Sequence, residues 1–225
     1  MPEPLRASVK TESASQQVYR EIMRGLYEGR YVPGQRLVET DLVSEYGTSR
    51  FIIKDTMKRL LAEGVVVNTF YRGNQIPRLT REETAHIHEV MQTLFALAGR
   101  QAASGSWDEQ EAHRLELARA ELQTHVDASR FFDSSRACNH FFRQIVLMSG
   151  NTEIMRVARA LRIHIIRVQF KPWPEAGEYN RRAEIDRIAA AILGRDADAA
   201  EACIRDYFQT LAQIIAALPD RAFSN

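Results

Sequence analysis

The sequence predicts a mainly α-helical protein with two parts, a winged helix-turn-helix domain followed by an antiparallel bundle of six helices. Three observations predict this fold. Apolar residues recur at steps of three and four along most of the chain. The one strand-like stretch, at residues 65–76, directly follows two short helical segments. Beyond residue 80 only helical patterns remain, separated by short breaks, as in a bundle.

Length and charge fit this division. A chain of 225 residues is comfortable for two domains. The formal net charge is only +1, and the basic excess lies in residues 1–79, which hold 12 Lys or Arg against 9 Asp or Glu. Cys138 and Cys203 are the only cysteines and form no CxxC pair, which excludes a disulfide framework or a zinc knuckle. No apolar stretch approaches the roughly 20 residues that a membrane span needs, so we expect a cytoplasmic protein with no membrane partner.

The first elements follow from local signals. Residues 1–13 are polar and contain two prolines, which predicts a flexible arm. Apolar spacing predicts a first helix over residues 17–27, ended by Gly29 and by the Pro33-Gly34 step. A second helix is expected over residues 38–46, and Gly47 breaks the chain after it.

The next helix carries the predicted function. Ser49 is a good N-cap, Ile53 and Met57 continue an apolar rear face, and Gly64 closes the helix in the left-handed conformation. Arg50 and Lys54 stand one turn apart on the other side. A helix with a basic first turn and an apolar rear can enter a major groove by its amino end. The alternative is an ordinary solvated charged face.

The strand-like stretch completes the domain and helps to choose between a DNA-binding helix and an ordinary solvated charged face. Residues 65–70 predict one strand, residues 71–74 a turn and residues 75–76 a short return strand. The turn contains Arg72 and Gly73, and an arginine at a thin turn can reach phosphate or the minor groove. Helix, turn, helix and ribbon in this order favour a DNA-binding domain.

At these residues a family resemblance is specific. Residues 14–78 resemble the amino-terminal domain of GntR-type transcriptional regulators. The shared pattern includes Pro33-Gly34-Gln35-Arg36-Leu37, Gly47-Thr48-Ser49-Arg50, Leu60 with Glu63-Gly64, and Arg72-Gly73. The remainder resembles the FadR subfamily, whose all-helical FCD domain binds an effector. The resemblance implies a homodimer that binds a double-stranded DNA operator and responds to a small molecule.

The recognition turn departs from the family pattern. Relatives usually read Ser-Arg-Thr-Pro-Val-Arg-Glu, whereas this chain has Phe51 and Ile52 in place of Thr-Pro and Lys54 in place of the second Arg. Lys54 keeps the charge but loses bidentate recognition of guanine. Phe51 either contacts a thymine methyl or simply packs. The resemblance gives these candidate DNA-contacting residues: Thr40, Ser49, Arg50, Phe51, Lys54, Arg72 and Gly73.

Residues 79–81 are the expected hinge, and the effector and dimerisation domain is expected over residues 82–220. Thr80 and Glu83 form a capping box at its start. Helices are expected at 82–103, 108–126, 130–148, 151–170, 179–193 and 196–218.

Metal-dependent relatives hold a divalent ion with one Asp and three His. Aligned by the Gly150-Asn151 step and the loop after Gly194, these positions fall on Cys138, Phe142, Ile185 and Tyr207. Phenylalanine and isoleucine cannot bind a metal. We therefore expect no metal and no cofactor.

Two polar positions of relatives are also apolar here, namely Met91 and Phe95. Two explanations compete. Either the cavity has filled in and the bundle serves only dimerisation, or it is an apolar pocket for an acyl, aromatic or similar ligand. The candidate lining residues are Met91, Phe95, Cys138, Phe142, His164, Ile185 and Tyr207.

The expected function is that of a ligand-responsive DNA-binding regulator, with repression the commoner outcome in the family. We expect no enzymatic activity, because the sequence has no phosphate loop and no paired carboxylates. Four isolated histidines, His86, His88, His113 and His125, are expected to be surface residues. The rival reading is a helical interaction protein that has lost DNA binding.

Overall fold

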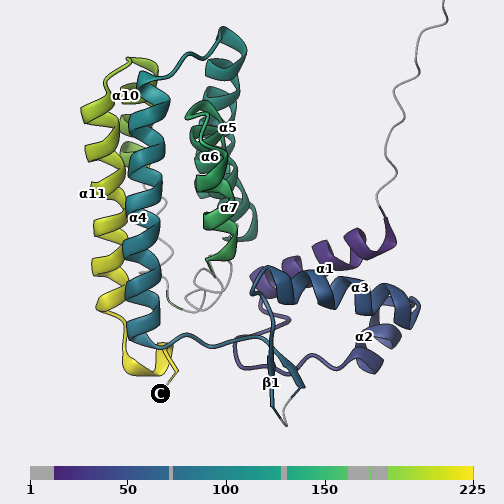
Figure 1. The fold of residues 1–225 in the computed structure, drawn as a ribbon. Helices are drawn as coiled ribbons and strands as arrows, with labels where there is room; N and C mark the ends of the chain where they lie inside the picture. The colour runs from purple at the N-terminus through teal and green to yellow at the C-terminus, as the bar shows by residue number, and fades with distance from the viewer. Residues whose placement is uncertain (1–12, 71–72, 128–130, 162–172, 174–181, 225) are drawn as a thin grey trace, which may run out of the picture.

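The computed structural model describes residues 13–70, 73–127, 131–161, 173 and 182–224. It is mainly α-helical, with three helices and a hairpin at the amino end and a bundle of longer helices beside them (Figure 1). The predicted fold class is confirmed. Several expectations lie outside the described residues: the arm predicted over residues 1–13, apart from Ser13, the wing residue Arg72 and the lining residue His164.

The helices of the amino-terminal part are α1 (Ala14–Glu28), α2 (Glu39–Tyr46) and α3 (Arg50–Ala62). Glycine ends the first two, because Gly29 (φ 81°) and Gly47 (φ 57°) take the left-handed conformation that closes a helix. Gly64 (φ 68°) does the same two residues after α3, as the sequence predicted. The apolar sides of the helices meet in a core that includes Ile22, Leu26, Ile53, Met57 and Leu60.

The wing is a two-stranded antiparallel hairpin of β1 (Val67–Thr69) and β2 (Gly73–Gln75), with Asn68 opposite Asn74. The first strand is shorter than predicted. Val65 and Val66 are buried, and their N–H groups donate to the carbonyl of Leu60, which ties them to the end of α3. The strand that the sequence predicted from Val65 therefore begins at Val67, directly after the two buried residues.

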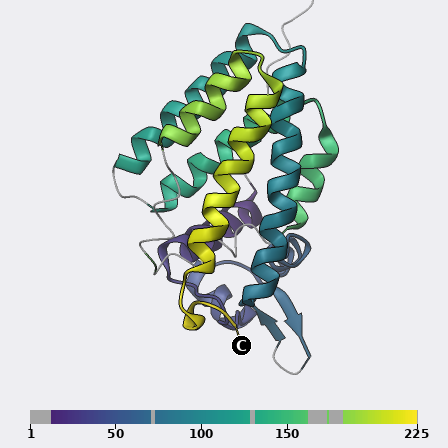
Figure 2. The same ribbon diagram turned by 90° about the vertical axis from the view of Figure 1, so that its left-hand side faces the viewer.

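The carboxyl-terminal part contains α4 (Arg81–Ser104), α5 (Glu109–Asp127), α6 (Phe131–Met148), α7 (Thr152–Ala160), α10 (Arg182–Leu193), α11 (Ala197–Ala216) and a 3-10 turn, η1 (Asp220–Ala222). Helices α4 and α11 run side by side over their length (Figures 1 and 2). The predicted capping box is present, with Thr80 Oγ accepting from the Glu83 N–H at 3.0 Å. Among the described residues, no helix is both long and apolar enough to cross a membrane.

One predicted helix has a wrong boundary. The helix that Asn151 caps ends at Ala160, where the sequence predicted residue 170, because Leu161 takes an extended backbone (φ −74°, ψ 134°). Neither glycine nor proline stands there, so the sequence carries no stop signal. Residues 162–172 and the predicted start of the next helix at residue 179 lie outside the described residues.

One histidine was also placed wrongly. His86 and His113 are exposed and His125 is half-buried, but His88 is buried, with 3% of its surface exposed. The reason is its position on α4. His88 follows Thr84 by one turn and precedes Met91 by three residues, and both of these side chains are buried in the bundle.

The base of the bundle is closed by a clamp between the hinge and the end of the chain. The Arg81 guanidinium donates to the carbonyls of Ala216 (2.7 Å) and Leu218 (2.8 Å) and to the Asp220 carboxylate (2.9 Å). The same group lies over the ring of Phe223, 4.3 Å from its centroid. Residues after α11 are therefore held against the first turn of α4.

Candidate nucleic-acid interface and helical core

The rear of α3 is fixed to the domain by burial and by hydrogen bonds. Ile53 and Leu60 are fully buried. Thr56 is 1% exposed, and its hydroxyl donates to the carbonyl of Ser15, at the start of α1, at 3.1 Å. The helix therefore has one orientation relative to α1, which decides which side chains face outward.

A second contact pins the carboxyl half of α3. The Arg59 guanidinium lies over the ring of Tyr19, 3.6 Å from its centroid, and pairs with Glu63 at 3.0 Å. The Tyr19 hydroxyl donates to the same Glu63 carboxylate. Burial, and then this hydrogen bond, raise the pKa of Tyr19 above its ordinary value. Arg59 thus makes its contacts within the domain.

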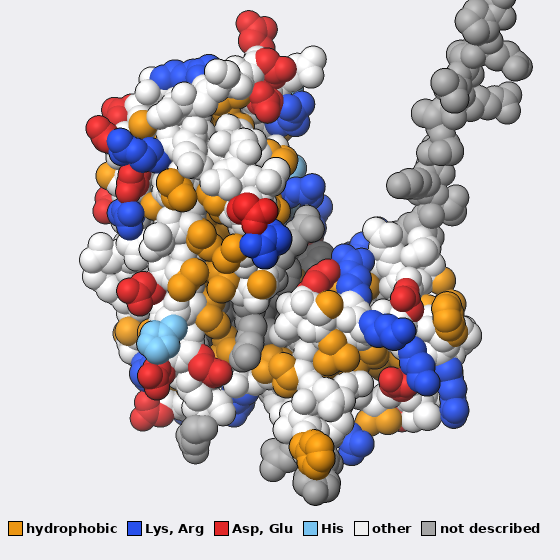
Figure 3. All heavy atoms as spheres, in the orientation of Figure 1, with side chains coloured by type: hydrophobic (Ala, Val, Ile, Leu, Met, Phe, Trp, Pro, Cys, Tyr) orange, Lys and Arg blue, Asp and Glu red, His pale blue; other side chains and the backbone are white. Residues whose placement is uncertain are grey.

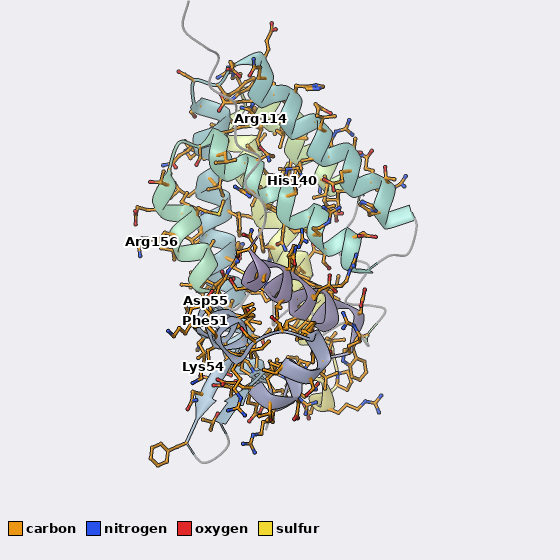
Figure 4. The ribbon with its side chains drawn as sticks, turned by 90° about the vertical axis from the view of Figure 1, so that its right-hand side faces the viewer. Phe51, Lys54, Asp55, Arg114, His140 and Arg156 are labelled. Atoms are coloured by element: carbon orange, nitrogen blue, oxygen red, sulfur yellow. The ribbon has the colours of Figure 1, made fainter. Side chains whose placement is uncertain are left out.

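The outward face of the first turn is exposed and basic. Ser49 accepts from the Ile52 N–H at 3.3 Å and caps the helix, as predicted. Arg50 and Lys54 are exposed, and within the described part of the chain neither forms an ion pair. Phe51 has 80% of its surface exposed, so it does not pack within the chain. Figure 4 shows Phe51 and Lys54 together at this end of α3.

The remaining predicted contacts come from α2 and the wing. Thr40 is exposed in the first turn of α2, with its hydroxyl 3.4 Å from the Asp41 carboxylate. Gly73 (φ 71°) begins β2 in the left-handed conformation that turns the hairpin. Arg72 lies outside the described residues.

Two wing residues were missed by the sequence reasoning. Phe70, at the tip of the hairpin, has 83% of its surface exposed. Arg36 forms an isolated bridge with Gln75, and its guanidinium nitrogens lie 3.6 Å from the position that a Cβ on Gly73 would take. Arg36 is thereby the basic residue beside the wing. The position of Phe70 next to the predicted turn was the signal for the first, and Arg36 stood in the shared family motif without a predicted role.

All the described lining candidates of the bundle are buried, and Phe95, Phe142, Cys138 and Tyr207 among them form a contact cluster. Their exposed fractions are at most 8%, and they come from four helices: Met91 and Phe95 (α4), Cys138 and Phe142 (α6), Ile185 (α10) and Tyr207 (α11). The ring of Phe142 lies 5.1 Å from that of Phe95 and 5.3 Å from that of Tyr207, centroid to centroid. Cys138 Sγ lies 3.6 Å from the Tyr207 hydroxyl.

These positions do not fit the divalent metal that the resemblance implies. Phe142 and Ile185 offer no donor atom, and Cys138 and Tyr207 stand in place of two more ligands. Within the residues that the structure describes, no group of three or more His, Cys, Asp or Glu could hold a metal ion.

Among the described residues, two hollows lie at the bundle surface, and neither is lined by a residue of this cluster. One, of about 250 Å³, lies at the base between α4, α11 and Phe223, and buried His88 lines it. The other, of about 380 Å³, lies between α6 and α7, where Val146, Leu147 and Met155 contribute apolar surface and Arg143 and Arg156 positive charge.

Comparison with known families matches both parts of the chain. Residues 14–73 match the family model described as "Bacterial regulatory proteins, gntR family". Residues 86–210, more than half of the chain, match the model described as "FCD domain". The boundary between the two matches falls around the hinge and the first turn of α4.

Known proteins can be aligned with this chain over nearly its whole length. The HTH-type transcriptional repressor RspR of Escherichia coli is 19% identical over 91% of this chain and 90% of its own. A probable D-xylose utilization operon transcriptional repressor of Paenarthrobacter nicotinovorans is 22% identical over 95% and 91%. The solved structure of E. coli McbR/YncC superposes with a TM-score of 0.76 at 17% identity, covering 92% of this chain and 98% of that one.

Proposed function

The chain belongs to the gntR family of bacterial regulatory proteins and carries an FCD domain, so it is a transcriptional regulator, and from that premise we propose that it is a homodimeric repressor. Its two winged domains bind the two half-sites of a pseudo-palindromic DNA operator. Such a protein acts in the bacterial cytoplasm.

The observation that carries the proposal is the outward face of α3. Arg50, Phe51 and Lys54 are exposed within one turn, while Ile53 and Met57 anchor the helix from behind. The positive charges sit at the amino end, where the helix dipole also attracts phosphate. Ser49 and Arg50 contact phosphate and base edges in the major groove, and Phe51 contacts a thymine methyl.

The other candidate contacts flank this helix. Thr40 on α2 faces the DNA backbone, and Arg72 and Gly73 in the wing reach phosphate or the minor groove. Arg36, beside Gly73, adds positive charge to the same edge.

Repression is supported by the two relatives named above, both of which are named transcriptional repressors. Release of the operator then requires a signal, and in a two-domain regulator the signal enters through the helical domain. A coupling free energy of about 1–3 kcal/mol between effector and DNA is typical of such proteins.

The effector is an apolar, aromatic or acyl molecule, not a carboxylate held by a metal. The support is chemical: of the described lining residues, only Cys138 and Tyr207 present a polar group to the cluster. A mostly apolar lining with few polar groups selects for an apolar ligand.

A second candidate is favoured by the ring contacts. Phe142 touches Phe95, Tyr207 and Phe208 at centroid distances of 5.1 to 5.5 Å, so these side chains fill the space among themselves. In this case the bundle is a dimerisation domain without a small-molecule effector. Mass spectrometry of the purified protein, native and then denatured, separates the two, because a co-purifying apolar molecule supports the first candidate and a ligand-free dimer supports the second.

DNA binding is tested by selecting DNA from a randomised library and measuring affinity across salt concentrations. Arg50→Ala should lower discrimination at one base position by about 1–3 kcal/mol, and Lys54→Ala should reduce the salt slope by about 1. Arg114→Ala is the matched control, since Arg114 is an exposed arginine on the bundle, remote from α3 (Figure 4). Unchanged base preference in Arg50→Ala would refute its role. Absence of salt-dependent binding by the wild type would favour a helical interaction protein instead.

A further inference from the structure

The hollow of about 250 Å³ at the base of the bundle lies where α4 begins and α11 ends, next to the linker. Small side chains on both helices keep the groove between them open: Ala85 on α4, and Ala212 and Ala216 on α11. Buried side chains, each at most 5% exposed, also line it: His88, Ile215 and Phe223. A cavity of about 150 Å³ can hold benzene, so this hollow has room for a molecule about the size of a bicyclic ring.

This hollow differs from the effector site that the family resemblance implies. Its lining includes no residue of the contact cluster around Phe142. The match to the FCD family model covers residues 86–210, and most of the lining residues lie outside that range, either before it, as Arg81 does, or after it, as Phe223 does. The hollow is therefore formed largely by the segments that flank the matched domain.

Two hydrogen-bond acceptors stand at the end of the hollow that lies farther from the linker. Glu89 is exposed and forms no ion pair with another described residue. Gln92 lies three residues further along α4, on the same side of the helix. Its amide nitrogen donates to the carbonyl of Arg205 at 3.4 Å, which leaves its side-chain oxygen as an acceptor. A carboxylate and an amide oxygen suit an ammonium group, because that group donates three hydrogen bonds and accepts none.

The positive charge at the other end of the hollow is already neutralised. The Arg81 guanidinium donates to the Asp220 carboxylate at 2.9 Å and to the carbonyls of Ala216 and Leu218. The carboxyl end of α11 also brings the negative end of its helix dipole to this place. Figure 3 shows further acidic side chains on the surface around this end of the bundle. The hollow therefore favours a cation over an anion.

We propose that this hollow binds a small primary amine with an apolar or aromatic body. The ammonium group donates to Glu89 and Gln92, and the body lies against Ile215 and Phe223. The site is separate from the effector site proposed for the contact cluster. Its tests require no DNA, so their failure would leave the proposed DNA-binding function untouched.

The first test compares two probes by ligand-detected NMR titration of the full chain. Tryptamine and indole-3-propionate share the ring and the spacer but carry opposite charges. Tryptamine should bind with a dissociation constant of about 1 mM or below, as a ligand of this size can, and indole-3-propionate at least about 10-fold more weakly. Equal binding of the two probes, or tighter binding of the propionate, would refute the amine class. Absence of saturable tryptamine binding up to about 10 mM would refute the site.

A charge variant tests the ammonium contact. Glu89→Gln keeps the shape of the side chain and removes its charge, so it should weaken tryptamine binding about 5-fold, an effect limited by the exposure of Glu89. Glu82→Gln is the matched control, because Glu82 is also exposed and lies two turns before Glu89 on the same side of α4, but does not line the hollow. Equal tryptamine affinity in Glu89→Gln and the wild type would show that the carboxylate makes no such contact.

A filling variant tests the location. Ala212→Leu places a larger side chain in the hollow and should weaken tryptamine binding at least about 10-fold. Ala202→Leu, at an exposed alanine of α11 that does not line the hollow, should leave binding unchanged. Urea denaturation checks that both variants remain folded. A folded Ala212→Leu variant that binds tryptamine like the wild type would place the amine elsewhere and overturn the inference.

Amide hydrogen exchange locates the bound amine without any substitution. The N–H groups of Phe223 and Ser224 donate to the carbonyls of Asp220 and Leu79, each at 2.9 Å. Because Phe223 lines the hollow, bound tryptamine should slow exchange in residues 219–224 by at least about 3-fold. Unchanged exchange in these residues at saturating tryptamine would overturn the inference, whether or not protection arises around Phe142.

Discussion

Replacing Phe142 by alanine distinguishes a filled bundle core from an open effector pocket. The Phe142 side chain is 3% exposed, and four rings surround it: those of Phe95, Phe141, Tyr207 and Phe208, at centroid distances of 5.1 to 5.6 Å. Removing a ring packed on all sides leaves a cavity, and Phe→Ala changes of this kind cost about 3–5 kcal/mol. Aromatic contacts contribute about 0.5–1.5 kcal/mol beyond the buried area. If the core is filled, Phe142→Ala should therefore lower the free energy of unfolding by about 4 kcal/mol.

The measurement is urea denaturation followed by circular dichroism, with the midpoint shifted at unchanged slope. Leu117→Ala provides the control, since Leu117 is 55% exposed on α5 and its removal should change stability by less than about 0.5 kcal/mol. If Phe142 lined an empty pocket, one side of its ring would have no partner atoms to lose. A loss below about 1.5 kcal/mol would therefore refute the packed core and support the pocket.

Three further outcomes are expected. Lys54→Arg should strengthen discrimination for guanine at one operator position by about 1–3 kcal/mol, measured by competition binding, because arginine restores the bidentate contact. Gly99→Ala should destabilise the bundle by about 1–3 kcal/mol in urea denaturation, although alanine favours helix, because the added Cβ would overlap the buried side chain of Ile204. Tyr19→Phe should flatten the fall of stability above pH 10. The pKa of Tyr19 is raised by burial and by Glu63, so the unfolded chain ionises first and stability is lost as pH rises from the unfolded pKa toward the folded one.

The fold was largely readable from the sequence because its signals are local. Ser49 caps α3, Gly47 and Gly64 adopt left-handed conformations and Thr80 forms its capping box, each at the predicted position. Such signals act over three or four residues, and apolar periodicity then assigns each helix its inner face.

The predictions from sequence failed where tertiary contacts determine the local structure. His88 looks like a surface residue among charged neighbours, yet the packing of α4 buries it. Helix α7 ends at Leu161 without a local stop signal. The position of Arg36 beside the wing depends on a bridge to Gln75, 39 residues away, which no sequence period records.

In the candidate sites, too, the sequence predicted what depends on local spacing and missed what depends on contacts between distant residues. Exposure of Arg50 and Lys54 followed from helical spacing, but the choice between a packed and an exposed Phe51 required the structure. In the bundle, the resemblance to metal-dependent relatives pointed to Cys138 and Tyr207 as neighbours, and these two side chains do meet. Whether neighbouring rings leave a space depends on the rotamers of several helices together.

The Arg81 clamp gives the hinge two anchors instead of one. A linker fixed only by the first turn of α4 would be free to rotate. Here the Arg81 guanidinium also donates to the carbonyls of Ala216 and Leu218, and the Ser224 N–H donates to the carbonyl of Leu79 at 2.9 Å. The beginning and the end of the bundle thus meet at its base, next to the linker (Figure 1). A displacement of α11 along α4 would therefore move residues 79–81 as well, which links the packing around Phe95 and Tyr207 to the position of the linker.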